Sequence, residues 1–104
     1  MLRQLFSRPP IKQFALGLAE DISRRYPPET ESRPGKRTSV NRMTRIVEDA
    51  SNKAKVFTME HDLGWLGKAR LGNAFKWALL EKGYKKEFAD FATEAVIVTL
   101  SKKG

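Results

Sequence analysis

Residues 40–61 of the chain read VNRMTRIVEDASNKAKVFTMEH, and this stretch decides the fold. Its apolar or neutral side chains recur at gaps that alternate between three and four residues, at Val40, Met43, Val47, Ala50, Ala54, Phe57 and His61. At 100° per residue these positions form one stripe along a helix, which Ile46 widens, whereas a strand would need alternation at every second residue. The stretch therefore predicts a long helix that buries one side.

Three other segments have the periodicity of helices. The first lies between two Pro-Pro pairs, the second ends at Gly83, and the third has acidic residues in its first turn. Such residues commonly mark where helices begin and end. We therefore expect an all-α fold, a small bundle of about four helices at 11–26, 39–61, 66–82 and 86–101.

The length and composition fit a single domain. A chain of 104 residues buries roughly 65% of the surface that it exposes when unfolded. Hydrophobic residues make up 40% of it and charged residues 31%, which suits a packed interior with a solvated exterior. We expect one helical domain at 11–104, with an N-terminal arm at 1–10 and a mobile basic loop at 27–38.

An α+β arrangement is the alternative. Residues 55–59 include Val56 and Phe57, and residues 96–100 contain a run of β-branched side chains, so the two segments could pair as a short two-stranded sheet. The helical interpretation is favoured because the stripe of 40–61 passes through Phe57 without a break.

The segment 63–82 is apolar on two sides. One stripe contains Leu66, Ala69, Trp77 and Leu80, and the other contains Leu71, Phe75, Ala78 and Leu79. Such a helix is usually sandwiched between neighbours, and a stripe that its own chain cannot cover would need a second chain. Gly67 and Gly72 indicate either a close approach between helices or a helix that begins later, near Asn73.

Side-chain spacing gives further expectations about the core and the surface. The aromatic side chains fit the apolar stripes better than exposed stacking on bases, and we assign them to the core: Tyr26, Trp65, Trp77 and Tyr84. The last helix should bury Phe88, Phe91, Ala92, Ala95 and Thr99. Charged residues one turn apart predict the ion pairs Glu20–Arg24, Asp21–Arg25 and Asp49–Lys53.

Several classes of catalytic and metal site are excluded by composition. The chain has no cysteine and one histidine, His61, so it has no disulfide, thiol nucleophile, Cys/His zinc site or histidine-based triad. The carboxylates are scattered among basic residues, and there is no phosphate-binding glycine loop or nucleophile elbow. We expect a protein that is not an enzyme and that has no cofactor or metal.

The charge favours a polyanionic partner. Twenty basic and twelve acidic residues give a formal charge of +8, and no acid lies between positions 32 and 47. That segment contains the candidate site residues Arg33, Lys36, Arg37, Arg42 and Arg45. Guanidinium groups near the free N–H groups of a helix start suit phosphate, and on nucleic acid they would contact the backbone. The same residues could also form a solvated surface without a partner.

Two rival interpretations concern partners. Residues 75–98 could form a helix-turn-helix with Lys85 and Lys86 at the start of a reading helix, but Glu87, Asp90 and Glu94 would repel phosphates and favour an ordinary helical hairpin. The doubly apolar segment 63–82 instead suggests a protein-interaction or self-associating domain without a role in nucleic-acid binding.

The sequence predicts a soluble, cytoplasmic protein. No apolar run approaches the ~20 residues that a membrane span needs. Residues 1–8 contain Arg3 and Arg8 and no acid, so organelle targeting by this segment is a minor alternative.

Overall fold

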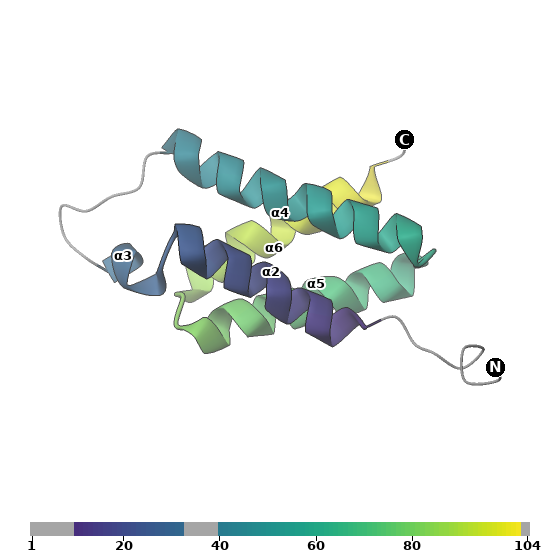
Figure 1. Cartoon of the computed structure of the whole chain (residues 1–104), viewed down its shortest axis with the longest axis horizontal. Coiled ribbons are helices and arrows are strands. Elements are labelled where there is room, and N and C mark those ends of the chain that lie inside the picture. Colours follow the sequence, from purple (N-terminus) through teal and green to yellow (C-terminus); the bar gives the residue numbers. More distant parts are fainter. Residues whose placement is uncertain (1–9, 33–39, 103–104) are drawn as a thin grey trace.

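The computed structural model describes residues 10–32 and 40–102. Within these ranges the chain is all-α, and four long helices form a bundle (Figure 1): α2 (Ile11–Arg25), α4 (Val40–Glu60), α5 (Trp65–Lys82) and α6 (Lys86–Ser101). The predicted fold class is confirmed. The alternative sheet is wrong, because 55–59 lies inside α4 and 96–100 lies inside α6.

The four helices form a ring in which two neighbouring helices run in one direction and the other two run in the opposite direction. Helix α2 packs on α5, α5 on α6 and α6 on α4, and the contact between α2 and α4 that closes the ring is the smallest of the four. As Figure 1 shows, α2 and α5 run in one direction, and α4 and α6 run in the other. The ends of α2 and α5 therefore lie together at the end of the bundle where α4 and α6 begin.

Helix α4 buries the predicted stripe from Ile46 to Phe57. Ile46, Val47, Ala50, Ala54 and Phe57 all lie in the core. The buried hydroxyls of Ser51 and Thr58 donate to backbone carbonyls of α4 itself, which satisfies these polar groups inside the bundle.

The end of α4 falls one residue short of the predicted position. Asp62 has a φ of 52°, and the N–H of Leu63 donates to the carbonyl of Thr58 at 2.9 Å. This backbone arrangement is a C-terminal helix cap, which leaves His61 exposed just past the helix with its ring 4.4 Å from that of Phe57.

Helices α5 and α6 approach closely at Gly72. A Cβ on Gly72 would lie 2.5 Å from Cδ1 and 3.1 Å from Cγ1 of Ile97. The close-approach interpretation of Gly72 is therefore confirmed, and α5 begins well before Asn73. At its other end α5 stops at Gly83, whose φ of 107° suits glycine.

Part of the predicted loop is helical. The short helix α3 (Pro28–Ser32) follows α2 after a break at Tyr26 and Pro27. A proline can end one helix and begin the next, because the first turn of a helix does not need its N–H. Residues 33–38, the remainder of the predicted loop, lie outside the described residues.

The expected face of α6 is rotated. The buried residues of this helix are Phe88, Ala89, Ala92, Val96 and Leu100. Ala95 and Thr99 are only half-buried, and Phe91 is 48% exposed. The reason is that α6 packs on both α4 and α5, so its buried arc is centred between these two neighbours.

The expectation that both tryptophans lie in the core is wrong. Trp65 is 79% exposed and Trp77 56% exposed. Tyr26 and Tyr84 are buried as predicted, and the hydroxyl of Tyr84 donates to the backbone carbonyl of Tyr26. Their rings stack at 5.8 Å, which holds the turn between α5 and α6 against the end of α2.

The predicted ion pairs within helices are replaced largely by pairs between helices. The structure pairs Arg24 with Asp21, Arg25 with Asp49, Lys53 with Asp21 and Lys82 with Glu20. Local spacing suggested the wrong partners because α2 presents its charged edge to α4 and α5, where side chains of other helices are closer.

Candidate functional site

Two of the five candidate site residues lie on the described part of the chain. Arg42 and Arg45 are three residues apart in the first two turns of α4, and both are exposed. Residues this far apart share one face of a helix. The other three candidates, Arg33, Lys36 and Arg37, fall outside the described residues.

Arg42 joins the start of α4 to the end of α2. Its Nη2 donates to the backbone carbonyl of Arg25 at 3.1 Å, and the Arg25 side chain pairs with Asp49 of α4 at 2.8 Å. Arg25 is the last residue of α2, where carbonyls lack a partner within the helix and carry partial negative charge. Arg42 thus combines a structural contact with a permanent positive charge.

The formal charge is unevenly distributed along the chain. All twelve acidic residues but only fourteen of the twenty basic ones lie in 10–32 and 40–102, which leaves that part with a formal charge of +2. The other six basic residues are Arg3, Arg8, Arg33, Lys36, Arg37 and Lys103. Most of the excess charge therefore belongs to acid-free segments, of which 33–39 directly precedes α4.

One end of the bundle combines several basic residues. Figure 1 places the end of α2, the start of α4 and the turn between α5 and α6 at the same end. The basic residues there include Arg24, Arg25, Arg42, Arg45, Lys82, Lys85 and Lys86. Arg24, Arg25, Lys82 and Lys86 pair with acidic residues. Arg45 has no ion pair with a described residue, so its guanidinium is the one most available to a ligand on this part of α4.

The turn between α5 and α6 has the geometry of a helical hairpin. The two helices lie antiparallel (Figure 1) and stay in contact as far as Gly72 and Ile97. The side chain of Lys86 pairs with Asp90 at 2.8 Å, and Lys76 pairs with the same carboxylate at 3.1 Å. A helix-turn-helix would need the two helices to cross near 90–120°, so the antiparallel arrangement fits an ordinary helical hairpin.

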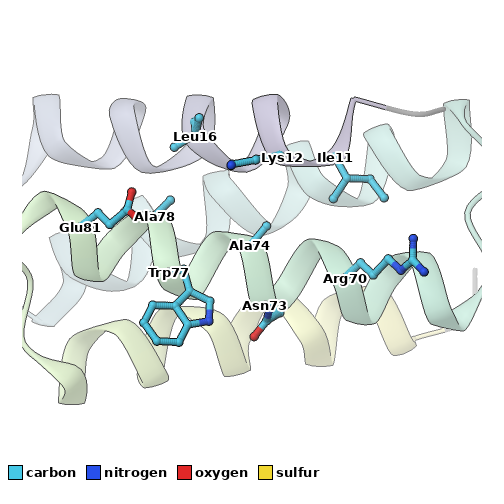
Figure 2. A pocket seen from close by; sticks show the side chains of 9 residues that line it. All are labelled: Ile11, Lys12, Leu16, Arg70, Asn73, Ala74, Trp77, Ala78 and Glu81. Carbon is cyan, nitrogen blue, oxygen red and sulfur yellow. The ribbon is translucent and has the colours of Figure 1, made fainter. Parts of the chain in front are cut away.

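A groove between α2 and α5 was missed by sequence reasoning. It encloses about 480 Å³ and is lined by Ile11, Lys12, Leu16, Arg70, Asn73, Ala74, Trp77, Ala78 and Glu81 (Figure 2). The available signal was the apolar stripe of 63–82 that contains Leu66 and Trp77, of which Trp77 lines the groove. The stripe with Leu71 and Phe75 is buried, whereas Leu66 and Trp77 of the other stripe remain exposed.

Three carboxylates have lowered pKa values because lysines pair with them. The ammonium of Lys82 lowers the pKa of Glu20, that of Lys53 lowers the pKa of Asp21, and that of Lys86 lowers the pKa of Asp90. A general acid at neutral pH needs the opposite shift. Among residues 10–32 and 40–102 there is no group of three side chains suited to hold a metal ion, and no helix long and apolar enough to cross a bilayer.

Comparison of the chain with models of protein families, with curated proteins and with solved structures finds no significant match. Any function proposed for this bundle must therefore be argued from its own surface.

Proposed function

We propose that the protein is a non-enzymatic binding module that contacts a polyanion, most simply the phosphate backbone of nucleic acid. The proposed contact residues are Arg33, Lys36, Arg37, Arg42 and Arg45. The observation that carries the proposal is the exposed pair Arg42 and Arg45 on the first turns of α4, directly after the acid-free segment 33–39. A cytoplasmic location fits such a partner.

The chemistry of the α4 start supports phosphate as the ligand. The first backbone N–H groups of a helix lack partners within the helix, and its dipole favours an anion there. The first turn of α4 contains no acidic residue to oppose this effect. The hydrogen bond from Arg42 to the end of α2 keeps this turn in place on the bundle.

The proposal predicts how strongly the affinity for DNA depends on salt concentration. Five phosphate contacts on duplex DNA give a log–log slope of affinity against salt concentration of about −4.5. A fourfold rise in salt, from about 50 to 200 mM, would then weaken binding several hundredfold. Backbone contacts of this kind carry little sequence preference.

The test is fluorescence anisotropy with a labelled DNA duplex over a range of salt concentrations. The triple variant Arg37→Ala, Arg42→Ala, Arg45→Ala should bind more weakly, with a slope that is smaller by about 2.7. The control variant Lys55→Ala, Lys68→Ala, Lys102→Ala removes the same formal charge from other positions and should keep the full slope. An equal loss in both variants would mean attraction by overall charge alone, and the proposed site would be wrong.

A protein-interaction or self-associating domain is the second candidate. It is favoured by the exposed apolar stripe of α5, where Leu66 is 53% exposed and Trp77 56% exposed. Exposed clusters of large apolar side chains often mark protein interfaces. Light scattering separates the two candidates, because the polyanion-binding module does not need a second chain.

A further inference from the structure

The contact between α2 and α4, which we call the α2–α4 seam, is the weak side of the helix ring. It is the smallest of the four contacts between the long helices. A crevice of about 250 Å³ lies along the seam, and its apolar lining consists of Leu18, Ile22, Ile46 and Ala50. A second crevice of about 380 Å³ lies between Phe14 and the later turns of α4. Apolar packing therefore holds the ring together least on this side.

Ion pairs close one end of the seam. Arg25 of α2 pairs with Asp49 of α4 at 2.8 Å, and Asp21 of α2 pairs with Lys53 of α4 at 2.9 Å. The four side chains are between 36% and 57% exposed. Exposed pairs of this kind each contribute little to stability. Strong interactions are therefore not what holds α2 and α4 together at this end.

Two further cationic groups lie at the same end. Arg24 shares the carboxylate of Asp21 within α2, and Arg42 of α4 donates to the backbone carbonyl of Arg25. With Arg25 and Lys53, four cationic side chains thus lie beside only two carboxylates, Asp21 and Asp49. A change that removes or reverses one charge therefore leaves like charges facing each other across the seam.

The other end of the seam is held by an aromatic contact. The rings of Phe14 in α2 and Phe57 in α4 stack with their centroids 4.1 Å apart and their planes at 9°. Such a pair contributes more than its buried area alone. Because α2 and α4 run in opposite directions, this contact joins the start of α2 to the later part of α4 (Figure 1).

The end of α2 is fixed to the far side of the bundle. The hydroxyl of Tyr84 donates to the carbonyl of Tyr26, and Lys82 of α5 pairs with Glu20 of α2. Helix α2 also has its largest contact with α5. If the seam parts, α2 therefore stays on α5, and the first half of α4 is the element that moves.

We propose that the α2–α4 seam opens at the end that its ion pairs close. The first half of α4, residues 40–50, swings away from α2 about the stacked rings of Phe14 and Phe57, while the helices stay folded and α4 stays on α6. This movement exposes the crevice lining around Ile46 and Ala50. Such local openings occur more often than global unfolding. The proposal concerns a movement within the bundle and does not depend on binding of a polyanion.

A single introduced thiol tests the opening, because the chain has no cysteine of its own. Ala50→Cys places the thiol in the crevice. The control Ala89→Cys places it on α6, one turn before Thr93, which lies near Gly72 of α5. Ala50 is 5% exposed and Ala89 0%. The rate of reaction with a disulfide reagent that releases a coloured thiolate should be roughly tenfold or more higher at position 50. Low urea concentrations should accelerate the reaction at position 89 but hardly at position 50, because the opening exposes little surface.

Charge reversal separates an opening of the seam from slight exposure of position 50 in the closed bundle. Arg25→Asp places a carboxylate opposite Asp49 and should raise the rate at position 50 about fivefold, without effect at position 89. The double variant Arg25→Asp, Asp49→Arg restores an attractive pair and should return the rate to its original value. The matched control Lys86→Asp makes the same change of charge in a pair within α6 and should leave both rates unaltered.

Three results would overturn the proposed opening. The first is an equal rate at positions 50 and 89 that follows global unfolding in urea. The second is a folded Arg25→Asp variant that leaves the rate at position 50 unchanged or raises both rates by the same factor. The third is a double variant that reacts as fast as Arg25→Asp alone. Circular dichroism verifies that each variant is folded, and the comparison of the two positions stands even if Arg25→Asp does not fold.

Discussion

The close approach of α5 and α6 makes Gly72 a sensitive position for the packing of the bundle. Replacement by alanine adds a Cβ that would lie 2.5 Å from Cδ1 and 3.1 Å from Cγ1 of Ile97. Carbon atoms that are not bonded prefer about 3.5–4.0 Å. The terminal methyl of Ile97 can rotate away, but Cγ1 cannot move without a change of χ1, which is strongly restricted for isoleucine in a helix.

Two opposing terms set how much Gly72→Ala changes the free energy of unfolding. Alanine is better than glycine in a helix by about 1 kcal/mol, and overpacking of a tight contact costs about 1–3 kcal/mol. We expect Gly72→Ala to lower the free energy of unfolding by about 1 kcal/mol. In an Ile97→Ala background, where both obstructing atoms are absent, the same change should raise it by about 1 kcal/mol.

The assay is urea unfolding followed by circular dichroism at one protein concentration. Gly17→Ala is the matched control, because Gly17 lies in α2 with nothing within 4 Å of its would-be Cβ. That change should stabilise the protein by about 1 kcal/mol. The packing argument would be refuted if Gly72→Ala stabilised the protein as much as Gly17→Ala did, with no dependence on residue 97.

Three further predictions concern the ends of the helices and the charged edge of α2. Tyr84→Phe should lower the free energy of unfolding by about 1 kcal/mol, because the buried hydroxyl no longer donates to the Tyr26 carbonyl; urea titration measures this loss. Gly83→Ala should cost about 1 kcal/mol in the same assay, since an alanine at a φ of 107° is strained, and an unchanged urea midpoint would contradict this. The Lys53 ammonium holds the pKa of Asp21 below its ordinary value. The stabilisation that this ion pair gives is therefore fully present when the pH is above the ordinary pKa of Asp21, and it is lost as the pH falls through the lowered pKa. Below about pH 4 the urea midpoint of the unaltered protein should therefore fall more steeply than that of Lys53→Met, and parallel pH profiles would count against this pair.

Local sequence patterns were sufficient to predict the helices. The stripe from Val40 to Phe57 is a property of one segment, and helix ends are set by nearby residues such as Pro27 and Gly83. These features do not depend on how the helices are arranged. The fold class and the approximate bounds of the long helices therefore follow from the sequence alone.

The arrangement of the helices could not be predicted from local patterns. Asp21 pairs with Lys53 as well as with Arg24 because α2 lies beside α4, and Phe91 is exposed because α6 packs on α4 and α5 together. Similarly, the apolar stripe of α5 that remains exposed is determined by which helices flank α5. The sequence indicated two stripes, but only the order of helices around the bundle shows that Trp77 belongs to the uncovered one.

The candidate polyanion site was partly accessible to sequence reasoning. Arg42 and Arg45 have the expected position and exposure at the start of α4. The contact between Arg42 and the Arg25 carbonyl was not foreseen, because it joins two helices whose ends meet only in the folded bundle.

The most direct test of the proposed function maps the contact on the protein itself. Backbone amide signals of the labelled protein are followed by nuclear magnetic resonance while a short DNA duplex is added at low salt. We expect the largest shifts for residues 33–45, with smaller effects at the end of α2 and little change along α5. Shifts that are absent at saturating DNA, or that concentrate on α5 and spare the start of α4, would contradict the proposed site.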